Sequence, residues 1–179
     1  DGEAAKAAKI LGVTVRENLN MRDGFFVNDE SHQLAIIKML RKYQPEIVLC
    51  NAIDDRHIDH GKGSKLVSDA CFLSGLRKIE TEINNEKQES WRPKFVYHYI
   101  QWKNIKPDFV VDITGYSQIK VDAILAYDSQ FYNPDTNEPE TPIATKNFLE
   151  SLSYRSQDLG RLIGVDFAEG FTVEMYFCF

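Results

Sequence analysis

The stretch IVLCNAIDDRHIDHGKGSKLVSDA, residues 47–70, decides how the chain is interpreted. It opens with the short apolar run IVLC, which turn-forming residues bound and which predicts a buried strand of a parallel sheet. A polar loop with His57 and His60 follows, and the helical pattern SKLVSDACFLSGL comes after it. Because ligands gather beyond the carboxyl ends of parallel strands, this loop is the first candidate for a functional site.

Upstream of this stretch, two helical patterns flank a short strand pattern. The alanine-rich segment before Gly12 predicts a helix, since Ala is the strongest helix former and Gly commonly follows a helix end. A β-branched run at 13–17 predicts a strand, and Asp23-Gly24 predicts a turn. The apolar spacing of ESHQLAIIKMLRKYQ predicts a second helix, which Pro45 ends.

Downstream, strand and helix patterns continue to alternate. KFVYHYIQ and DFVVDIT predict strands, and the second is so apolar that we expect it in the centre of the sheet. TEINNEKQESWRP predicts an irregular surface connection. Helices are predicted for YSQIKVDAILAYDSQF and ATKNFLESLSYRSQDLGRLIG, and a last strand for FTVEMYFCF. The alternation, with no linker or internal repeat, predicts one α/β domain over residues 1–179 with a mostly parallel sheet.

Composition excludes some classes of function. The net charge of −6 argues against binding nucleic acid, which requires a basic face. No apolar run is long enough for a membrane span. Cys50, Cys71 and Cys178 lie in apolar contexts and form no CxxC, which indicates buried free thiols in a reducing, cytoplasmic compartment.

The two histidines of the loop favour metal chemistry. Imidazole is the commonest ligand for zinc, and a loop can present His60 to a metal while holding His57 nearby. Asp59 lies between them and could accept a hydrogen bond from a ring N–H. From the spacing alone, a polar surface loop without function stays open as the alternative. His98, on the strand KFVYHYIQ, is either a structural histidine or a ligand.

Several segments, taken in order, resemble one enzyme family. They are EAAKAAKILGV, NLNMRDG, QPEIVLCNAIDDRHIDH, PDFVVDIT, KVDAILAYDSQF and LGRLIGVDFAEGF. Together they resemble the LmbE-like, PIG-L-type zinc deacetylases, most closely those of bacillithiol biosynthesis. The resemblance implies a Rossmann-like, three-layer domain that binds zinc and removes an N-acetyl group from a glucosamine conjugate, here N-acetylglucosaminyl malate. It also implies a homo-oligomer, with a hexamer as the expected form, and no nucleic-acid or membrane partner.

The resemblance also assigns roles to residues of the loop. It makes His60 a zinc ligand and His57 the residue that stabilises the tetrahedral intermediate and protonates the leaving amine. Asp59 is then the residue that orients His57. Arg56 is implied to bind substrate.

Two further substrate contacts lie elsewhere in the sequence. The resemblance implies them for Asp23, in the RDG segment, and for Gln130, in AYDSQF. Glu169 is either a support for the site or a buried structural carboxylate.

One departure from the family pattern is that these residues contain no AHPDD motif. The resemblance places that motif, with two zinc ligands, the general base and a first strand, upstream of Asp1. We therefore expect the 179 residues alone to be inactive. A related deacetylase with another N-acetylated sugar as substrate is one alternative, and a metal-free sugar-binding module of the same fold is another.

Overall fold

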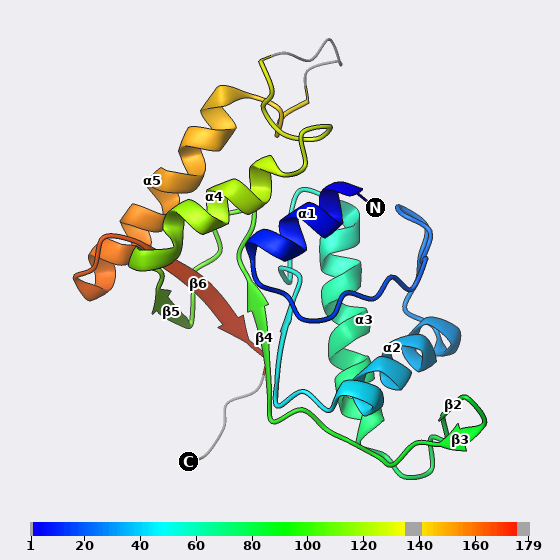
Figure 1. Cartoon of the computed structure of the whole chain (residues 1–179). Coiled ribbons are helices and arrows are strands. Elements are labelled where there is room, and N and C mark those ends of the chain that lie inside the picture. Colours follow the sequence, from blue (N-terminus) through cyan, green and yellow to red (C-terminus); the bar gives the residue numbers. More distant parts are fainter. Residues whose placement is uncertain (1, 135–140, 175–179) are drawn as a thin grey trace. The chain divides into compact units, whose positions relative to one another are not determined.

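A computed structural model of the chain describes residues 2–134 and 141–174 (Figure 1). The chain divides into two compact units. Unit 1 comprises Asp1–Asn18 with Val110–Glu169, and unit 2 comprises Leu19–Phe109 with Gly170–Phe179. Cys178 and the end of the predicted last strand lie outside the described residues.

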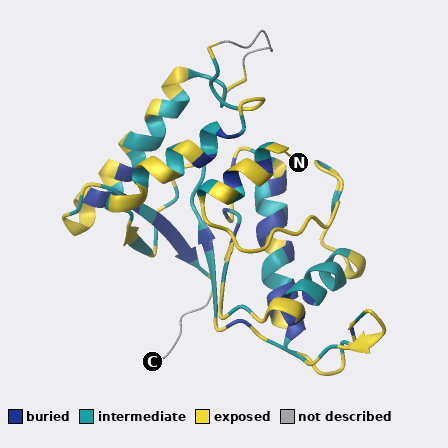
Figure 2. Ribbon diagram, viewed as in Figure 1, coloured by how far each residue is buried: buried dark blue, intermediate teal, exposed yellow. Residues whose placement is uncertain are grey.

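Unit 2 holds strands of a sheet, with one helix packed on them and a second helix packed on the first. Its elements are α2 (Glu30–Tyr43), β1 (Ile47–Cys50), α3 (Ile58–Ser74), β2 (Glu82–Ile83), β3 (Glu86–Lys87) and β4 (Phe95–Tyr99). The strands β1 and β4 run parallel, and α3 packs on α2, β1 and β4 (Figure 1). Ile37 and Leu40 of α2 meet Ala70 and Cys71 of α3 in the core of this unit. Buried residues follow α3 along its length (Figure 2).

The sheet is mixed, whereas the sequence predicted a mostly parallel one. Its strand order is β1-β4-β6-β5, where β5 is Phe109–Asp112 and β6 is Ala168–Val173. The pairing of β6 with β4 is antiparallel, with His98 opposite Thr172. Because β6 stands between β4 and β5 in this order, β5 is a terminal strand, and the prediction of a central position was wrong.

The strand β1 has β4 as its one neighbouring strand among the described residues. Ile47 is 54% exposed and Leu49 is 55% exposed, while Cys50 is buried. Burial of both faces of this apolar run stays a prediction.

Local sequence explains how α2 begins and ends. The Asp29 carboxylate accepts a hydrogen bond from the His32 backbone N–H at 3.0 Å, as an N-cap does. At the other end, Gln44 adopts a left-handed conformation with φ 48°, and its N–H donates to the Leu40 carbonyl. Pro45 follows, as the sequence predicted.

Arg41 joins α2 to the segment that follows α3. Its side chain is buried, and its Nε donates to the Ser74 carbonyl at 3.0 Å. Its terminal nitrogens donate to the Leu76 and Ile79 carbonyls and to Thr81 Oγ1 at 3.1, 2.7 and 2.8 Å. One guanidinium thus donates to four acceptors at and after the end of α3, of which the Ser74 and Leu76 carbonyls also accept backbone N–H groups.

The segment predicted as an irregular surface connection contains a small hairpin. The strands β2 and β3 pair antiparallel across Asn84 and Asn85, which have φ values of 54° and 64°. Positive φ at both central residues is the conformation of a type I′ turn, which Asn tolerates well. The Asn84-Asn85 pair is the sequence signal for this turn within the polar segment.

Unit 1 is mainly helical in its described residues. Its elements are α1 (Gly2–Ile10), the 3-10 turn η1 (Thr114–Tyr116), α4 (Ser117–Leu125) and α5 (Lys146–Ile163), with parts of β5 and β6. The helices α1 and α4 pack together, and the Glu3 carboxylate accepts hydrogen bonds from the Ser129 N–H and hydroxyl, each at 2.8 Å.

The end of α1 follows the prediction, but the segment after it does not. Gly12 has φ 67°, and Val13 N–H donates to the Ala8 carbonyl, which is the Schellman arrangement. Residues 13–17 form no strand, and Val13 and Val15 are about half exposed, at 48% and 51%. The β-branched run has no neighbouring strand among the described residues, and a strand needs such a partner.

Candidate active site

The candidate loop lies at the start of α3, which begins earlier than the sequence predicted. Its N-cap is His57, whose Nδ1 accepts a hydrogen bond from the Asp59 backbone N–H at 3.2 Å. His60 therefore lies in the first turn of the helix and not in a loop. Since the imidazole satisfies one of the free N–H groups of the first turn, the helix can start inside a segment rich in turn formers.

The Asp23-Gly24 turn approaches this helix start from a distant part of the sequence. Gly24 N–H donates to Asp59 Oδ2 at 2.5 Å. Lys62 Nζ donates to the Gly24 carbonyl at 3.2 Å and lies 3.7 Å from Asp59 Oδ1. The pKa of Asp59 is lowered, chiefly by the Gly24 hydrogen bond. The predicted turn is present, and its backbone contacts the candidate site.

Asp23, His57 and Asp59 form a group that could hold a metal ion. One potential ligand atom from each lies within 4.8 Å of the others. Asp59 Oδ1 is buried and accepts no hydrogen bond, and its ion-pair partner Lys62 Nζ lies 3.7 Å away. Carboxylate oxygen and imidazole nitrogen are both zinc ligands, so the donors suit this ion. His60 is not part of the group.

His60 is held by a different carboxylate. Its Nδ1 lies 2.6 Å from Asp55 Oδ2, and the Asp55 side chain is fully buried. The His60 and His57 ring centroids are 5.4 Å apart. Because an ionised carboxylate only accepts, Nδ1 of His60 carries the proton and Nε2 keeps its lone pair. The Asp55 carboxylate therefore contacts the His60 ring, whereas the Asp59 carboxylate accepts a hydrogen bond from the Gly24 backbone N–H.

Asp55 also contacts the segment after β4. Its Oδ1 accepts hydrogen bonds from the backbone N–H groups of Trp102 and Lys103 at 3.1 and 3.0 Å. Burial would raise the pKa of Asp55, but hydrogen bonds from the His60 ring and the backbone lower it below its usual value. The exposed Arg56 guanidinium lies over the Trp102 ring, 5.1 Å from its centroid. Sequence reasoning missed Asp55 and Trp102, and the Asp-Asp pair before Arg56 was the available signal.

Two other predicted residues belong to unit 1. Gln130 is exposed in the turn after α4, and its backbone N–H donates to the Tyr127 carbonyl at 3.0 Å. Glu169 is 2.5 Å from Lys120 Nζ and is partly exposed. The role of Gln130 as a substrate contact stays a prediction.

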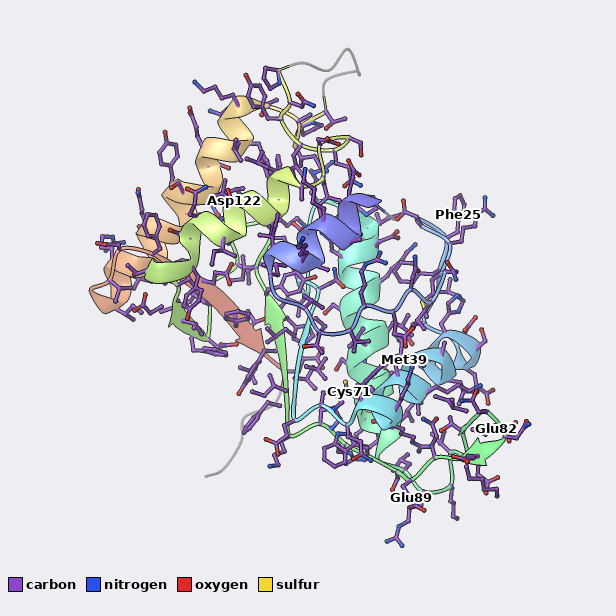
Figure 3. All side chains as sticks on the ribbon, in the orientation of Figure 1. Phe25, Met39, Cys71, Glu82, Glu89 and Asp122 are labelled. Carbon is purple, nitrogen blue, oxygen red and sulfur yellow. The ribbon has the colours of Figure 1, made fainter. Side chains whose placement is uncertain are left out.

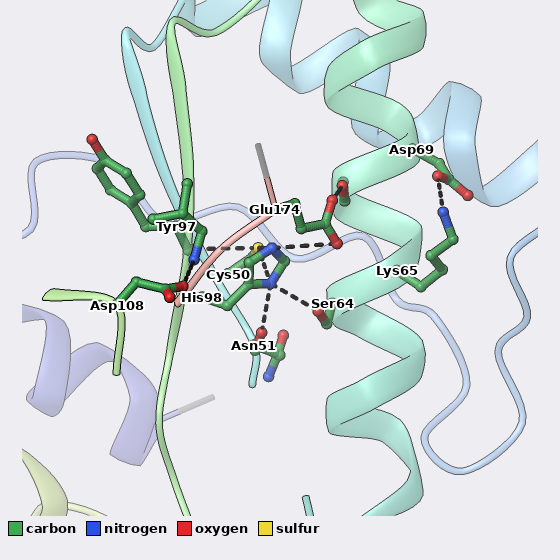
Figure 4. Close-up of polar contacts among 11 residues, drawn as sticks. Cys50, Asn51, Ser64, Lys65, Asp69, Tyr97, His98, Asp108 and Glu174 are labelled. Atoms are coloured by element: carbon green, nitrogen blue, oxygen red, sulfur yellow. Dashed lines mark hydrogen bonds and ion pairs between the residues drawn. The ribbon is translucent and has the colours of Figure 1, made fainter. Parts of the chain in front are cut away.

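The His98 side chain is fully buried in unit 2, and Figure 4 shows its contacts. Its Nδ1 lies 2.8 Å from Ser64 Oγ, 3.0 Å from the Asn51 carbonyl and 3.2 Å from Cys50 Sγ. Its Nε2 lies 3.5 Å from a carboxylate oxygen of Glu174. These contacts occupy both ring nitrogens, which favours the structural role over that of a metal ligand. Burial raises the pKa of the Cys50 thiol to about 12, so this sulfur is unreactive.

The surroundings of the RDG turn remain accessible. Phe25 projects from the ribbon and is 68% exposed, with the Arg22 guanidinium 4.1 Å from its ring centroid (Figure 3).

None of the helices in the described residues combines the length and apolar character needed to cross a membrane.

The candidate site in unit 2 lies within the part of the chain that a protein-family model matches. Residues 1–71 match the family model described as PIG-L, GlcNAc-PI de-N-acetylase. The fold is similar to that of the conserved protein TT1542 of Thermus thermophilus, with 29% identity and a TM-score of 0.85. This likeness covers 99% of the present chain and 74% of that protein.

Two solved enzymes share the fold at lower identity. N,N′-diacetylchitobiose deacetylase of Pyrococcus horikoshii is 24% identical with a TM-score of 0.75, over 96% of this chain and 61% of that one. The 4-carboxy-2-hydroxymuconate hydratase of Pseudomonas putida is 21% identical with a TM-score of 0.66, and the likeness covers 99% of this chain and 71% of that one. Such likenesses establish the fold and not the reaction. The family match over residues 1–71 supports the resemblance to PIG-L-type deacetylases, and the solved structures support the fold.

Proposed function

We propose that this protein is a zinc-dependent hydrolase that removes the N-acetyl group of a glucosamine conjugate, with N-acetylglucosaminyl malate as its substrate. The observation that carries the proposal is the first turn of α3, where His57, Asp59 and His60 stand together with the Asp23 turn. The match to a de-N-acetylase family and the likeness to a chitobiose deacetylase support an N-acetylated sugar as substrate.

The residues at this site fit a divalent metal. Asp59 Oδ1 is a buried acceptor that receives no hydrogen bond, and Nε2 of a neutral His60 ring keeps its lone pair because Nδ1 faces Asp55. We assign His60 as one zinc ligand. Asp23, His57 and Asp59 are the alternative ligand set. A bound zinc ion would polarise the amide carbonyl and acidify a water molecule.

The protein's own residues would stabilise the charge that develops on the substrate. Since Nδ1 of His57 accepts the Asp59 N–H, a neutral His57 ring carries its proton on Nε2 and donates from there. The positive end of the α3 dipole lies at the same place and favours a developing oxyanion. A preorganised donor of this kind contributes about 3 kcal/mol, or about 10²–10³ in kcat.

Substrate binding follows from the exposed polar groups nearby. Arg56 is an exposed cation next to the site, which suits an acidic group such as malate. The exposed Asp23 carboxylate suits sugar hydroxyls. Gln130 is the third proposed contact.

Metal content and amine release from N-acetylglucosaminyl malate test the proposal in the protein as its gene encodes it. We expect His57→Ala to lower kcat about 10²–10³-fold while zinc content stays near normal. We expect His60→Ala to lose zinc. His32→Ala, at the start of α2, is the control and should change neither quantity.

The same experiment separates the alternatives. If Asp23→Asn loses zinc while His60→Ala retains it, the metal is held by Asp23, His57 and Asp59. If the protein releases acetate from diacetylchitobiose but not from N-acetylglucosaminyl malate, the proposed deacetylation is right and the proposed substrate is wrong. A protein that binds sugar but neither binds metal nor cleaves the amide would be a sugar-binding module, which contradicts the proposal.

We further propose a cytoplasmic, homo-oligomeric protein, with a hexamer as the expected assembly. The free, buried Cys50 and Cys71 support a reducing compartment. Size-exclusion chromatography with light scattering measures the assembly, and a monomer at all concentrations would contradict it.

A further inference from the structure

The Asp55 carboxylate is fully enclosed, and N–H groups surround it. Its side chain has no exposed surface, while the His60 side chain is 30% exposed. Oδ1 receives two backbone N–H groups, from Trp102 and Lys103, and Oδ2 faces the His60 ring. A buried carboxylate requires such donors, so the environment keeps Asp55 ionised and its two oxygens in different roles.

This division of roles determines the state of His60. An ionised oxygen 2.6 Å from Nδ1 accepts a proton-bearing nitrogen, so the neutral His60 ring is the Nδ1–H tautomer. We propose that Asp55 is a positioning residue that fixes this tautomer and orientation and leaves Nε2 as a ligand atom for the metal. The proposal rests on the proposed function, in which His60 is a zinc ligand. A carboxylate in this position also raises the basicity of the ligating nitrogen.

The Asp55 carboxylate contacts both the His60 ring and the backbone of the segment after β4. Asp54 and Arg56, on either side of Asp55, contact that segment too: Asp54 pairs with Lys103 Nζ at 2.7 Å, and Arg56 lies over the Trp102 ring. The Asp54 and Arg56 contacts are on exposed side chains and are individually weak. Asp55 is the buried member of the three, so it carries the coupling between this segment and the His60 ring.

Asp55→Asn separates positioning from a purely structural role. The amide oxygen can still accept the Trp102 and Lys103 N–H groups, which keeps the connection to the segment after β4. The amide nitrogen then faces His60 and donates to Nδ1, which moves the ring proton to Nε2 and blocks metal binding there. Asp54→Asn is the matched control, because it removes the adjacent carboxylate and leaves the Asp55 contacts in place.

Two measurements on the metal-free protein test the proposal. Long-range ¹H–¹⁵N NMR, at a pH where imidazole is neutral, reports which nitrogen of His60 carries the proton. Competition with a chelator gives the Kd for Zn²⁺ alone. We expect Nδ1–H in the wild type and in Asp54→Asn, and Nε2–H in Asp55→Asn with about 10–100-fold weaker Zn²⁺ binding.

Several results would overturn the proposal. They are an Nε2–H tautomer in the wild type, an unchanged tautomer and Kd in Asp55→Asn, or an equal loss of affinity in Asp54→Asn. The wild-type spectrum decides the matter even if Asp55→Asn does not fold. Absence of deacetylase activity would refute the proposed function and leave the tautomer result standing, so the two failures are distinguishable.

Discussion

Replacing Arg41 by Met tests how strongly a single guanidinium holds α2 to the end of α3. Met keeps much of the aliphatic stem and removes every donor. The Ser74 carbonyl retains the Trp91 N–H at 3.1 Å and so keeps a partner. The buried Thr81 Oγ1 loses the donor that Arg41 supplies, as does the Ile79 carbonyl.

The size of the effect follows from these acceptors. A buried acceptor that loses its donor costs about 1–3 kcal/mol, and a partly exposed carbonyl costs less because water reaches it. The guanidinium no longer has to be desolvated in the variant, which offsets part of the loss. We expect Arg41→Met to lower the free energy of unfolding by about 3 kcal/mol, a large share of a typical domain's stability.

Urea unfolding followed by tryptophan fluorescence measures this change in unit 2 alone, because both tryptophans, Trp91 and Trp102, lie in that unit. Lys42→Met is the matched control, since Lys42 is exposed and its ammonium lies over the Tyr43 ring at 4.7 Å. We expect the control to change stability by at most about 0.5 kcal/mol. An Arg41→Met variant as stable as the control would refute the reasoning.

Two further predictions concern a close backbone approach and a helix cap. Gly160→Ala should destabilise unit 1 by about 1–3 kcal/mol, because the new Cβ would lie 2.6 Å from the Val165 carbonyl oxygen. Thermal unfolding followed by circular dichroism measures this loss. Gly115→Ala is the control, because a Cβ at Gly115 would have no atom within 4 Å. An equal Tm for both variants would contradict the close approach. Asp29 has a pKa lowered to about 2, first by the His32 N–H. Its contribution should therefore be complete above the unfolded pKa of about 4 and be lost as the pH falls from there toward 2. The difference in unfolding free energy between wild type and Asp29→Ala should thus shrink between pH 6 and 3, and a constant difference would count against the cap.

Much of the local structure could be predicted because it depends on neighbouring residues. The end of α1 at Gly12, the end of α2 before Pro45 and the existence of β4 followed from propensity and spacing. The errors lay where a partner is needed. Residues 13–17 have strand-forming side chains but no strand beside them among the described residues, and β5 was expected in the centre of the sheet.

The candidate site shows the same division. The sequence alone predicted His57, Asp59 and His60 as site residues, because their position after an apolar strand and the resemblance to a deacetylase family are properties of the sequence. It did not show that Asp55 holds His60, or that Gly24 holds the Asp59 carboxylate. Both carboxylates lie within five residues of the histidines, and their spacing gave no reason to choose between them.

The sequence by itself determined which residues are candidates for the site, and the tertiary structure decided which contacts each of them makes. Residue type and periodicity are local, so they predict helices, turns and a pair of histidines after a strand. The tautomer of His60 depends on a carboxylate whose other oxygen is held by Trp102 and Lys103, more than 40 residues away in the chain. Only folding brings those groups together, because burial forces the carboxylate to find donors wherever the chain supplies them.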